Sequence, residues 1–205
     1  MISVSLYIRK GVFMINSKAD YKKFLEMDMI ALGKSGRPKL VGDEIWKFQR
    51  LLRKTEYFVN CNKTFLGKIY SLYLQYRYHI FRKRLSFSIP LNVFGPGLSI
   101  AHYGTIVVNG NAKIGKNCRI QECTTIGATN GSTKAPVLGD NIFIGSGARI
   151  IGEVRIADNV AIGANAVIIK DIVEQGITVA GVPAKKVSNN NSYSNLNKKV
   201  VENLK

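Results

Sequence analysis

Few side chains in this 205-residue sequence could carry acid–base or metal chemistry. It has two histidines, His79 and His102, and imidazole is the side chain that best exchanges a proton near neutral pH. Two imidazoles are too few for a zinc site built from three, and Cys61, Cys118 and Cys123 form no CxxC pair. We therefore expect no metal and no disulfide framework, with the cysteines as small side chains in a reducing compartment.

A six-residue repeat of aliphatic residues predicts the fold that must position these groups. Five of the eleven repeats have glycine directly after the aliphatic residue, and small or aliphatic residues recur four positions after it. An α-helix cannot keep a six-residue period on one face, whereas the stacked turns of a parallel β-helix can. The alternative is a set of ordinary short strands with glycine turns. The repeated positions are Ile100, Ile106, Ile114, Ile120, Ile126, Leu138, Ile144, Ile150, Ile156, Ile162 and Ile168.

The pattern divides the chain into four parts. Residues 1–16 are predicted to be an N-terminal extension, 17–86 a helical domain, 87–187 the β-helix and 188–205 a flexible polar tail. Ser17 with Asp20 predicts a capping box at the first helix, and Asp43 is expected to cap the second. His79 lies in a basic helical stretch, where we expect an ordinary surface or packed residue.

The repeat region resembles the left-handed β-helix acyltransferases, most closely their serine acetyltransferase branch. The resemblance covers about residues 88–187, through GPGLSIAHYGTIVVNGNAKIGKNCRIQECTTIGATNG, the repeats that follow and the closing AGVPAK. It implies a left-handed parallel β-helix after an N-terminal helical segment, a homotrimer with sites between subunits, and acetyl-CoA as co-substrate. His102, in an AHYG context similar to the family's DHATG, falls at the catalytic histidine and is expected to be the base.

The family's spacing of 18 residues per turn, applied to this sequence, predicts two columns. One is a wall of small residues that would leave the backbone open to a pantetheine arm, although the corners of any β-helix also need small residues. In the other column, Glu122 is expected directly above His102, as a second catalytic residue that orients the imidazole. Lys185 and Lys186 are expected to meet the CoA phosphates. The predicted wall consists of Gly127, Ala128, Gly145, Ser146, Gly163 and Ala164.

The sequence departs from the serine enzymes where those bind serine. Ala101 replaces the aspartate before the histidine, Phe87 stands near the partner aspartate, and Lys134 and Ala135 replace an Arg-His pair. We therefore expect a sugar or glycan hydroxyl of surface-polysaccharide biosynthesis as acceptor, contacted by Tyr103 and Lys134. Serine O-acetylation in cysteine biosynthesis is the alternative. A non-catalytic β-helix scaffold that docks glycan or membrane is the alternative outside enzymes.

The formal net charge of +17 invites an anionic partner. No zinc-finger spacing or RNP-like strand is present, so we expect no nucleic acid. No apolar run approaches the roughly 20 residues of a membrane span and no signal peptide is evident, so a cytoplasmic protein is expected. Basic residues of the helical region could touch an anionic membrane or form a solvated face; they are Lys47, Arg50, Arg53, Lys54, Arg77, Arg82, Lys83 and Arg84.

Overall fold

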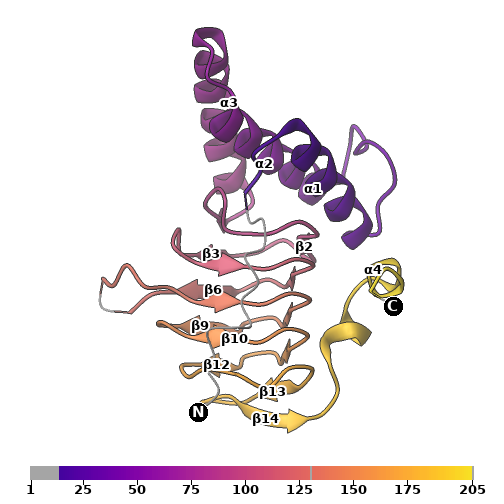
Figure 1. Cartoon of the computed structure of the whole chain (residues 1–205), viewed down its shortest axis with the longest axis vertical. Coiled ribbons are helices and arrows are strands. Elements are labelled where there is room, and N and C mark those ends of the chain that lie inside the picture. The colour runs from indigo at the N-terminus through magenta and orange to yellow at the C-terminus, as the bar shows by residue number, and fades with distance from the viewer. Residues whose placement is uncertain (1–13, 130, 205) are drawn as a thin grey trace.

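The computed structural model describes residues 14–129 and 131–204, and places a helical cap on one end of a three-sided β-helix (Figure 1). The helices are α1 (Lys18–Ala31), α2 (Glu44–Cys61) and α3 (Phe65–Arg84). The predicted N-terminal extension lies outside the described residues except for 14–16. Within that stretch Ile15 is fully buried, and its carbonyl accepts from Asn60 Nδ2 of α2.

Three sheets form the sides of the β-helix, and every strand pair is parallel except β13–β14. The first sheet contains, in spatial order, β1 (Phe87–Ser88), β3 (Ile106–Val108), β6 (Thr124–Gly127), β9 (Arg149–Ile151) and β12 (Val167–Ile168). The second contains β10 (Arg155–Ile156), β7 (Val137–Leu138) and β4 (Lys113–Ile114). The third contains β14 (Lys185–Ser188), β13 (Thr178–Ala180), β11 (Ala161–Ile162), β8 (Phe143–Ile144), β5 (Arg119–Ile120) and β2 (Ser99–Ile100).

The six-residue series forms the core of the β-helix, as the sequence predicts. Every residue of the series from Ile100 to Ile168 is at most 3% exposed. Ile144 pairs with Ile162, and Ile150 with Ile168, so successive rungs lie 18 residues apart in this part of the chain. Burial of each such side chain contributes roughly 1.5–3 kcal/mol, which makes this column the main support of the fold.

Asparagines form one corner of the prism, just before strands of the third sheet. Asn117, Asn141 and Asn159 have φ of 56°, 57° and 62°, a left-handed conformation that Asn tolerates better than most residues. Their amides form a ladder in which Asn117 donates to Asn141 and Asn141 donates to Asn159, each at 2.8 Å. The repeat thus provides hydrogen-bond partners for its own corner side chains.

Side-chain caps begin two of the three large helices. Ser17 accepts from the backbone N–H of Asp20 at 3.0 Å, as predicted, and Thr64 accepts from that of Gly67 at 3.1 Å. The expected cap at Asp43 is wrong. Asp43 has φ 54° and turns its carboxylate instead to Lys34 Nζ and the N–H of Lys39.

A buried ionic cluster joins the helices to the β-helix. Arg53 Nε lies 2.8 Å from Asp28 Oδ2, and Arg53 Nη1 lies 3.0 Å from Glu56 Oε2. Arg53 also donates to the carbonyls of Phe94 and Gly95, while Asp28 accepts from the N–H groups of residues 97 and 98. The prediction that groups Arg53 with exposed basic residues is therefore wrong: Arg53 is 0% exposed and holds the segment that leads to β2.

The uppermost strand of the third sheet has a side-chain partner in place of another strand. Gln49 of α2, fully buried, donates to the carbonyl of Leu98 at 2.7 Å and accepts from the N–H of Ile100 at 3.1 Å. Its amide therefore pairs with the free edge of β2 as a backbone peptide would. His102 follows two residues later.

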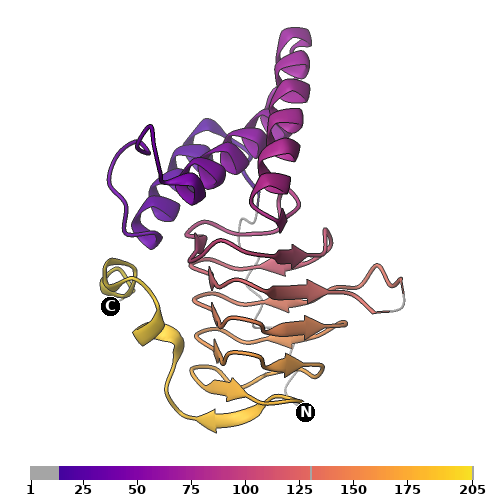
Figure 2. The same cartoon turned by 180° about the vertical axis from the view of Figure 1, so that it is seen from behind.

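The C-terminal residues fold back instead of forming the expected flexible tail. After β14 the chain runs up one side of the β-helix through η2 (Ser192–Asn195) to α4 (Lys198–Glu202), which contacts α1 (Figure 2). Ser192, Leu196 and Val200 are buried. The composition is polar, but these buried residues are enough to hold the segment against the corner that carries Asn141, whose carbonyl accepts from the Ser192 hydroxyl.

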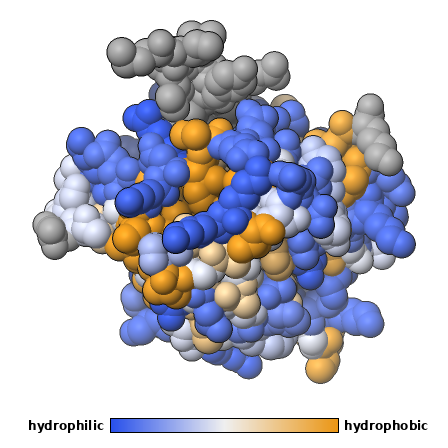
Figure 3. Space-filling model, turned by 90° about the horizontal axis from the view of Figure 1, so that it is seen from below, coloured by the Kyte–Doolittle hydropathy of each residue, from blue (hydrophilic) through white to orange (hydrophobic). Residues whose placement is uncertain are grey.

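In the part of the chain that the structure describes, no helix is long and apolar enough to span a membrane. Seen from below, the end of the β-helix far from the helices is mostly hydrophilic, with separate hydrophobic patches (Figure 3).

Candidate active site

His102 lies at the corner between the third sheet and the first. It follows β2 and precedes β3, and its side chain is exposed. Ile100 pairs with Ile120, whereas Ile106 pairs with Thr124. The rung therefore contains two more residues than the next one between these pairs, and they bulge out in the segment 101–105.

This bulge changes the neighbour predicted for Glu122. A Cβ on Gly104 would lie 2.9 Å from Cβ of Glu122, so Gly104 stacks on Glu122. The prediction that Glu122 lies directly above His102 is wrong, and no hydrogen bond or ion pair joins the two among the described contacts. The nearby Ser146 hydroxyl, with a smaller effect from His102, lowers the pKa of Glu122. Its Oε2 is buried with no partner among the described residues.

The predicted small-residue wall splits into two. Gly145 and Gly163 do stack, since each follows the paired residues Ile144 and Ile162 of the third sheet. Gly127 instead pairs with Ile151 in the first sheet, so its placement in this column is wrong. The loop after β6 adds six residues, because rungs across it lie 24 residues apart, as in Ile126–Ile150, instead of 18.

Packing explains some of these glycines but not all. A Cβ on Gly145 would lie 2.7 Å from the backbone N of Ala164, so the stacked rungs themselves require glycine there. A Cβ on Gly127 would make only ordinary contacts, the nearest at 3.5 Å. Nothing within the described residues requires glycine at 127, which leaves room for a ligand beside its backbone. Ala128, the next residue, is half-buried.

Two opposite corners of the first sheet therefore carry the candidate residues. His102, Glu122, Ser146 and Ala164 follow strands of the third sheet and share one corner. The loop with Lys134 follows Gly127 and Ala128 at the other corner, where Lys134 Nζ pairs with Glu153 at 2.8 Å. One copy of the chain does not bring Lys134 to His102.

The remaining predicted residues lie at the two ends of the β-helix. Tyr103 is 57% exposed beside His102. Lys185 and Lys186 lie on β14 at the far end, both exposed, and Lys186 pairs with Glu174.

Comparison with known proteins identifies the repeat. Residues 135–170 match the family model described as bacterial transferase hexapeptide (six repeats). The chain also superposes on the crystal structure of Neisseria gonorrhoeae serine acetyltransferase with a TM-score of 0.63 and 25% identity, over 84% of this chain and 68% of that one. Residues 135–170 thus carry the hexapeptide repeat of bacterial transferases. The chain has the left-handed β-helix fold of the serine acetyltransferases.

Curated proteins similar to this chain are named serine acetyltransferase. The Synechococcus elongatus protein is 34% identical over 95 residues, which cover 45% of this chain and 38% of the relative. The Buchnera aphidicola subsp. Acyrthosiphon pisum protein is 31% identical over 157 residues, covering 75% of this chain and 54% of the relative. The chain thus spans about half the length of such relatives or less. The Brucella abortus enzyme in complex with coenzyme A has the same fold, with a TM-score of 0.65 and 22% identity over 84% of this chain and 70% of that one.

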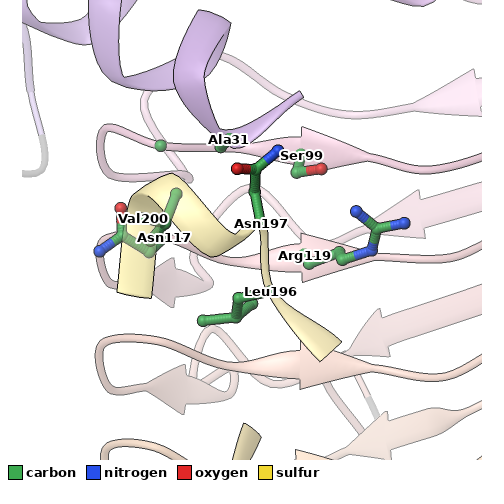
Figure 4. A pocket seen from close by; sticks show the side chains of 8 residues that line it. Ala31, Ser99, Asn117, Arg119, Leu196, Asn197 and Val200 are labelled. Carbon is green, nitrogen blue, oxygen red and sulfur yellow. The ribbon is translucent and has the colours of Figure 1, made fainter. Parts of the chain in front are cut away.

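Two pockets adjoin the end of the β-helix next to the helices, and sequence patterns point to neither. The smaller lies under α4, where Leu196, Asn197 and Val200 face Ala31 and Ser99 (Figure 4). At about 10 Å³ it has room for at most one water. The larger, an open groove of about 340 Å³, lies between α1–α2 and the third sheet and includes Ala101 and Tyr103. Helix-to-sheet contacts create it, so no local motif could reveal it.

Proposed function

We propose that this protein is an acetyl-CoA-dependent O-acetyltransferase with His102 as the general base. The observation that carries the proposal is the position of His102, exposed on one corner of a transferase-type β-helix that is similar to the serine acetyltransferases. An imidazole there can accept the proton of an acceptor hydroxyl as the oxygen attacks the thioester carbonyl. A positioned base of this kind typically contributes about 10²–10⁴-fold.

Acetyl-CoA fits the side of the molecule that carries Gly127. The backbone there is uncovered and glycine is not required by packing, as expected where a long thin ligand approaches closely. Ser146 and Ala164, at the opposite corner, have small side chains that project little from the backbone. Lys185 and Lys186 at the far end are proposed to meet the CoA phosphates. Acetyl-CoA supplies the activated acetyl group, and the protein binds it and excludes water.

A homotrimer would complete this site. His102 and Lys134 lie at opposite corners of one sheet, so a neighbouring copy would have to bring its Lys134 loop to the first copy's His102. We propose such a site between subunits, with Tyr103 and Lys134 beside the acceptor.

L-serine is the acceptor that the relatives favour, since those compared above are named for it. The expected sugar acceptor, membrane contact and polysaccharide role find no support in these comparisons. One observation still favours testing a sugar hydroxyl: Phe87 and Ala135, which stand at or near charged positions of the serine enzymes, are both buried here. A cytoplasmic location stays part of the proposal.

The test is acetyl-CoA consumption by the full chain with L-serine and with neutral and acidic sugars. We expect turnover that falls at least 100-fold in His102→Ala and is unchanged in His79→Ala, the matched control, whose exposed imidazole lies on α3. Turnover of serine would establish the serine enzyme, and turnover of sugars alone would establish the second candidate. Equal slow hydrolysis by all three proteins would refute catalysis and favour the scaffold.

A further inference from the structure

The open groove beside His102 has its own recognition chemistry. Its exposed lining is more polar than apolar, and its volume of about 340 Å³ lies within the range of small-molecule sites. Lys34 and Asp43 of the helical part form one rim, and Arg119 of β5 forms the other. The groove therefore joins the helices to the rung that carries the candidate base.

Two polar groups of the groove have no partner among the described residues. Ser99 is 3% exposed, and its hydroxyl is buried without a hydrogen bond. Such a group is uncommon in folded proteins, and because Ser99 also lines the smaller pocket under α4, its hydroxyl carries no argument about the groove. The guanidinium of Arg119 makes no hydrogen bond or ion pair with a described residue. Figure 4 shows it extending away from the tail residues Leu196 and Val200.

Arg119 is also the uncompensated charge of the groove. The opposite cation, Lys34, is paired with the carboxylate of Asp43. The Lys34 ammonium, followed by the N–H of Lys39, lowers the pKa of Asp43, which keeps that carboxylate ionised near neutral pH. An anion entering the groove would therefore meet a free guanidinium, the cation best shaped to hold a carboxylate or phosphate with two parallel hydrogen bonds.

The groove lies within reach of His102. Ser99 and Arg119 are paired across adjacent rungs, and Ala101 and Tyr103, the chain neighbours of His102, line the groove. Ser99 and His102 are three positions apart in the sequence, so their Cα atoms lie at most about 10 Å apart. A small molecule anchored at Arg119 could thus present a hydroxyl to the imidazole.

We infer that this groove is the acceptor site and that it selects hydroxyl compounds that carry a carboxylate or a phosphate. Arg119 binds the anionic group, and the acceptor hydroxyl faces His102. The inference rests on the proposed function. It supplies the anion recognition that Lys134 and Ala135 do not provide at the positions where the serine enzymes have their Arg-His pair.

Arg119→Gln removes the charge, and Arg155→Gln is its matched control. Arg155 holds the same place in its hexapeptide, directly before a core isoleucine, but lies exposed on the second sheet. We expect Arg119→Gln to raise the KM for an anionic acceptor at least tenfold without changing the KM for acetyl-CoA. Arg119→Lys should recover part of the loss. The control should match the wild type.

Four acceptors separate the sources of the anion: L-serine and glucuronate carry a carboxylate, glucose 6-phosphate carries a phosphate, and glucose carries neither. Calorimetry with the same compounds and the full chain measures their binding to the groove independently of turnover. Anionic compounds that bind the wild type but not Arg119→Gln support the inference. If they bind in this way but no acceptor is acetylated, the proposed function is refuted and the inference about the groove stands. Turnover with an unchanged KM in Arg119→Gln overturns the inference and leaves the proposed function standing. Equal or tighter binding of glucose than of the three anions overturns it as well.

Discussion

Arg53 joins α1, α2 and the segment before β2, and its replacement by methionine tests how far one buried cation holds the two halves together. The side chain is 0% exposed and contacts the carboxylates of Asp28 and Glu56. Methionine has a similar length and fills much of the space, so the change removes charge and hydrogen bonds more than volume.

The expected loss follows from these contacts. Removing one partner of a buried ion pair costs about 3–5 kcal/mol, because the other charge stays buried without compensation. The two hydrogen bonds to the carbonyls of Phe94 and Gly95 add about 1 kcal/mol each. We therefore expect the free energy of unfolding to fall by about 5–7 kcal/mol. At about 2–4 °C per kcal/mol for a chain of this size, Tm falls by roughly 10–28 °C.

The loss should depend on pH. Burial raises the pKa of Asp28 and of Glu56 above the ordinary carboxyl value, with Arg53 opposing the effect, so Arg53→Met raises both further. A carboxyl whose pKa is higher in the folded state binds more protons folded than unfolded. The free energy of unfolding then falls as pH rises through the window above the ordinary value. The destabilisation should be smaller at about pH 5 than at about pH 8.

Urea and thermal unfolding at fixed protein concentration, followed by circular dichroism, would measure this. The control is Arg50→Met on the same helix, where Arg50 is half-buried and lies 5.3 Å over the Trp46 ring, a contact worth about 1 kcal/mol or less. A loss below about 1 kcal/mol for Arg53→Met, or a larger loss at acid than at alkaline pH, would refute the reasoning.

Three further outcomes are expected. Tyr78→Phe, which removes a 2.6 Å hydrogen bond to a buried carbonyl, should cost about 1–2 kcal/mol in urea unfolding, whereas Tyr76→Phe, at an exposed position, should cost nothing measurable; equal effects would contradict the burial argument. Val200→Asp places a charge where α4 packs and should release the C-terminal segment, seen as faster proteolysis after β14 with the β-helix intact; unchanged digestion would count against it. Glu122→Gln should lower kcat less than tenfold, because His102 has only a minor effect on the pKa of Glu122; a loss as large as that of His102→Ala would show a direct contact.

Aliphatic periodicity alone was enough to predict the β-helix. Because each six-residue repeat places its aliphatic side chain inside at a fixed interval, the residues from Ile100 to Ile168 are recognisable in a single sequence, and all are buried. The helix cap formed by Ser17 and Asp20 could also be predicted, because a cap needs only residues within one turn of helix. These features depend on neighbours that are close in the chain.

The register across irregular turns was settled only by the tertiary structure. Extra residues in the 101–105 bulge and in the loop after β6 shift the pairing, which moved Glu122 away from the position above His102 and Gly127 into another sheet. The hydrophobic series stays in phase on both sides of such an insertion, so the pattern does not say which segment loops out. Spacing alone therefore placed the columns wrongly.

The polar features of the upper end were also beyond the sequence. From the sequence alone, Arg53 is one of many basic residues on a predicted helix, and Arg119 is an outward-facing residue of a repeat. Their roles depend on how α1 and α2 meet the first rungs, where one arginine is enclosed by carboxylates and the other faces an open groove. Local composition marks a residue as charged; whether that charge is buried and paired or open to a ligand is decided by segments far apart in the chain.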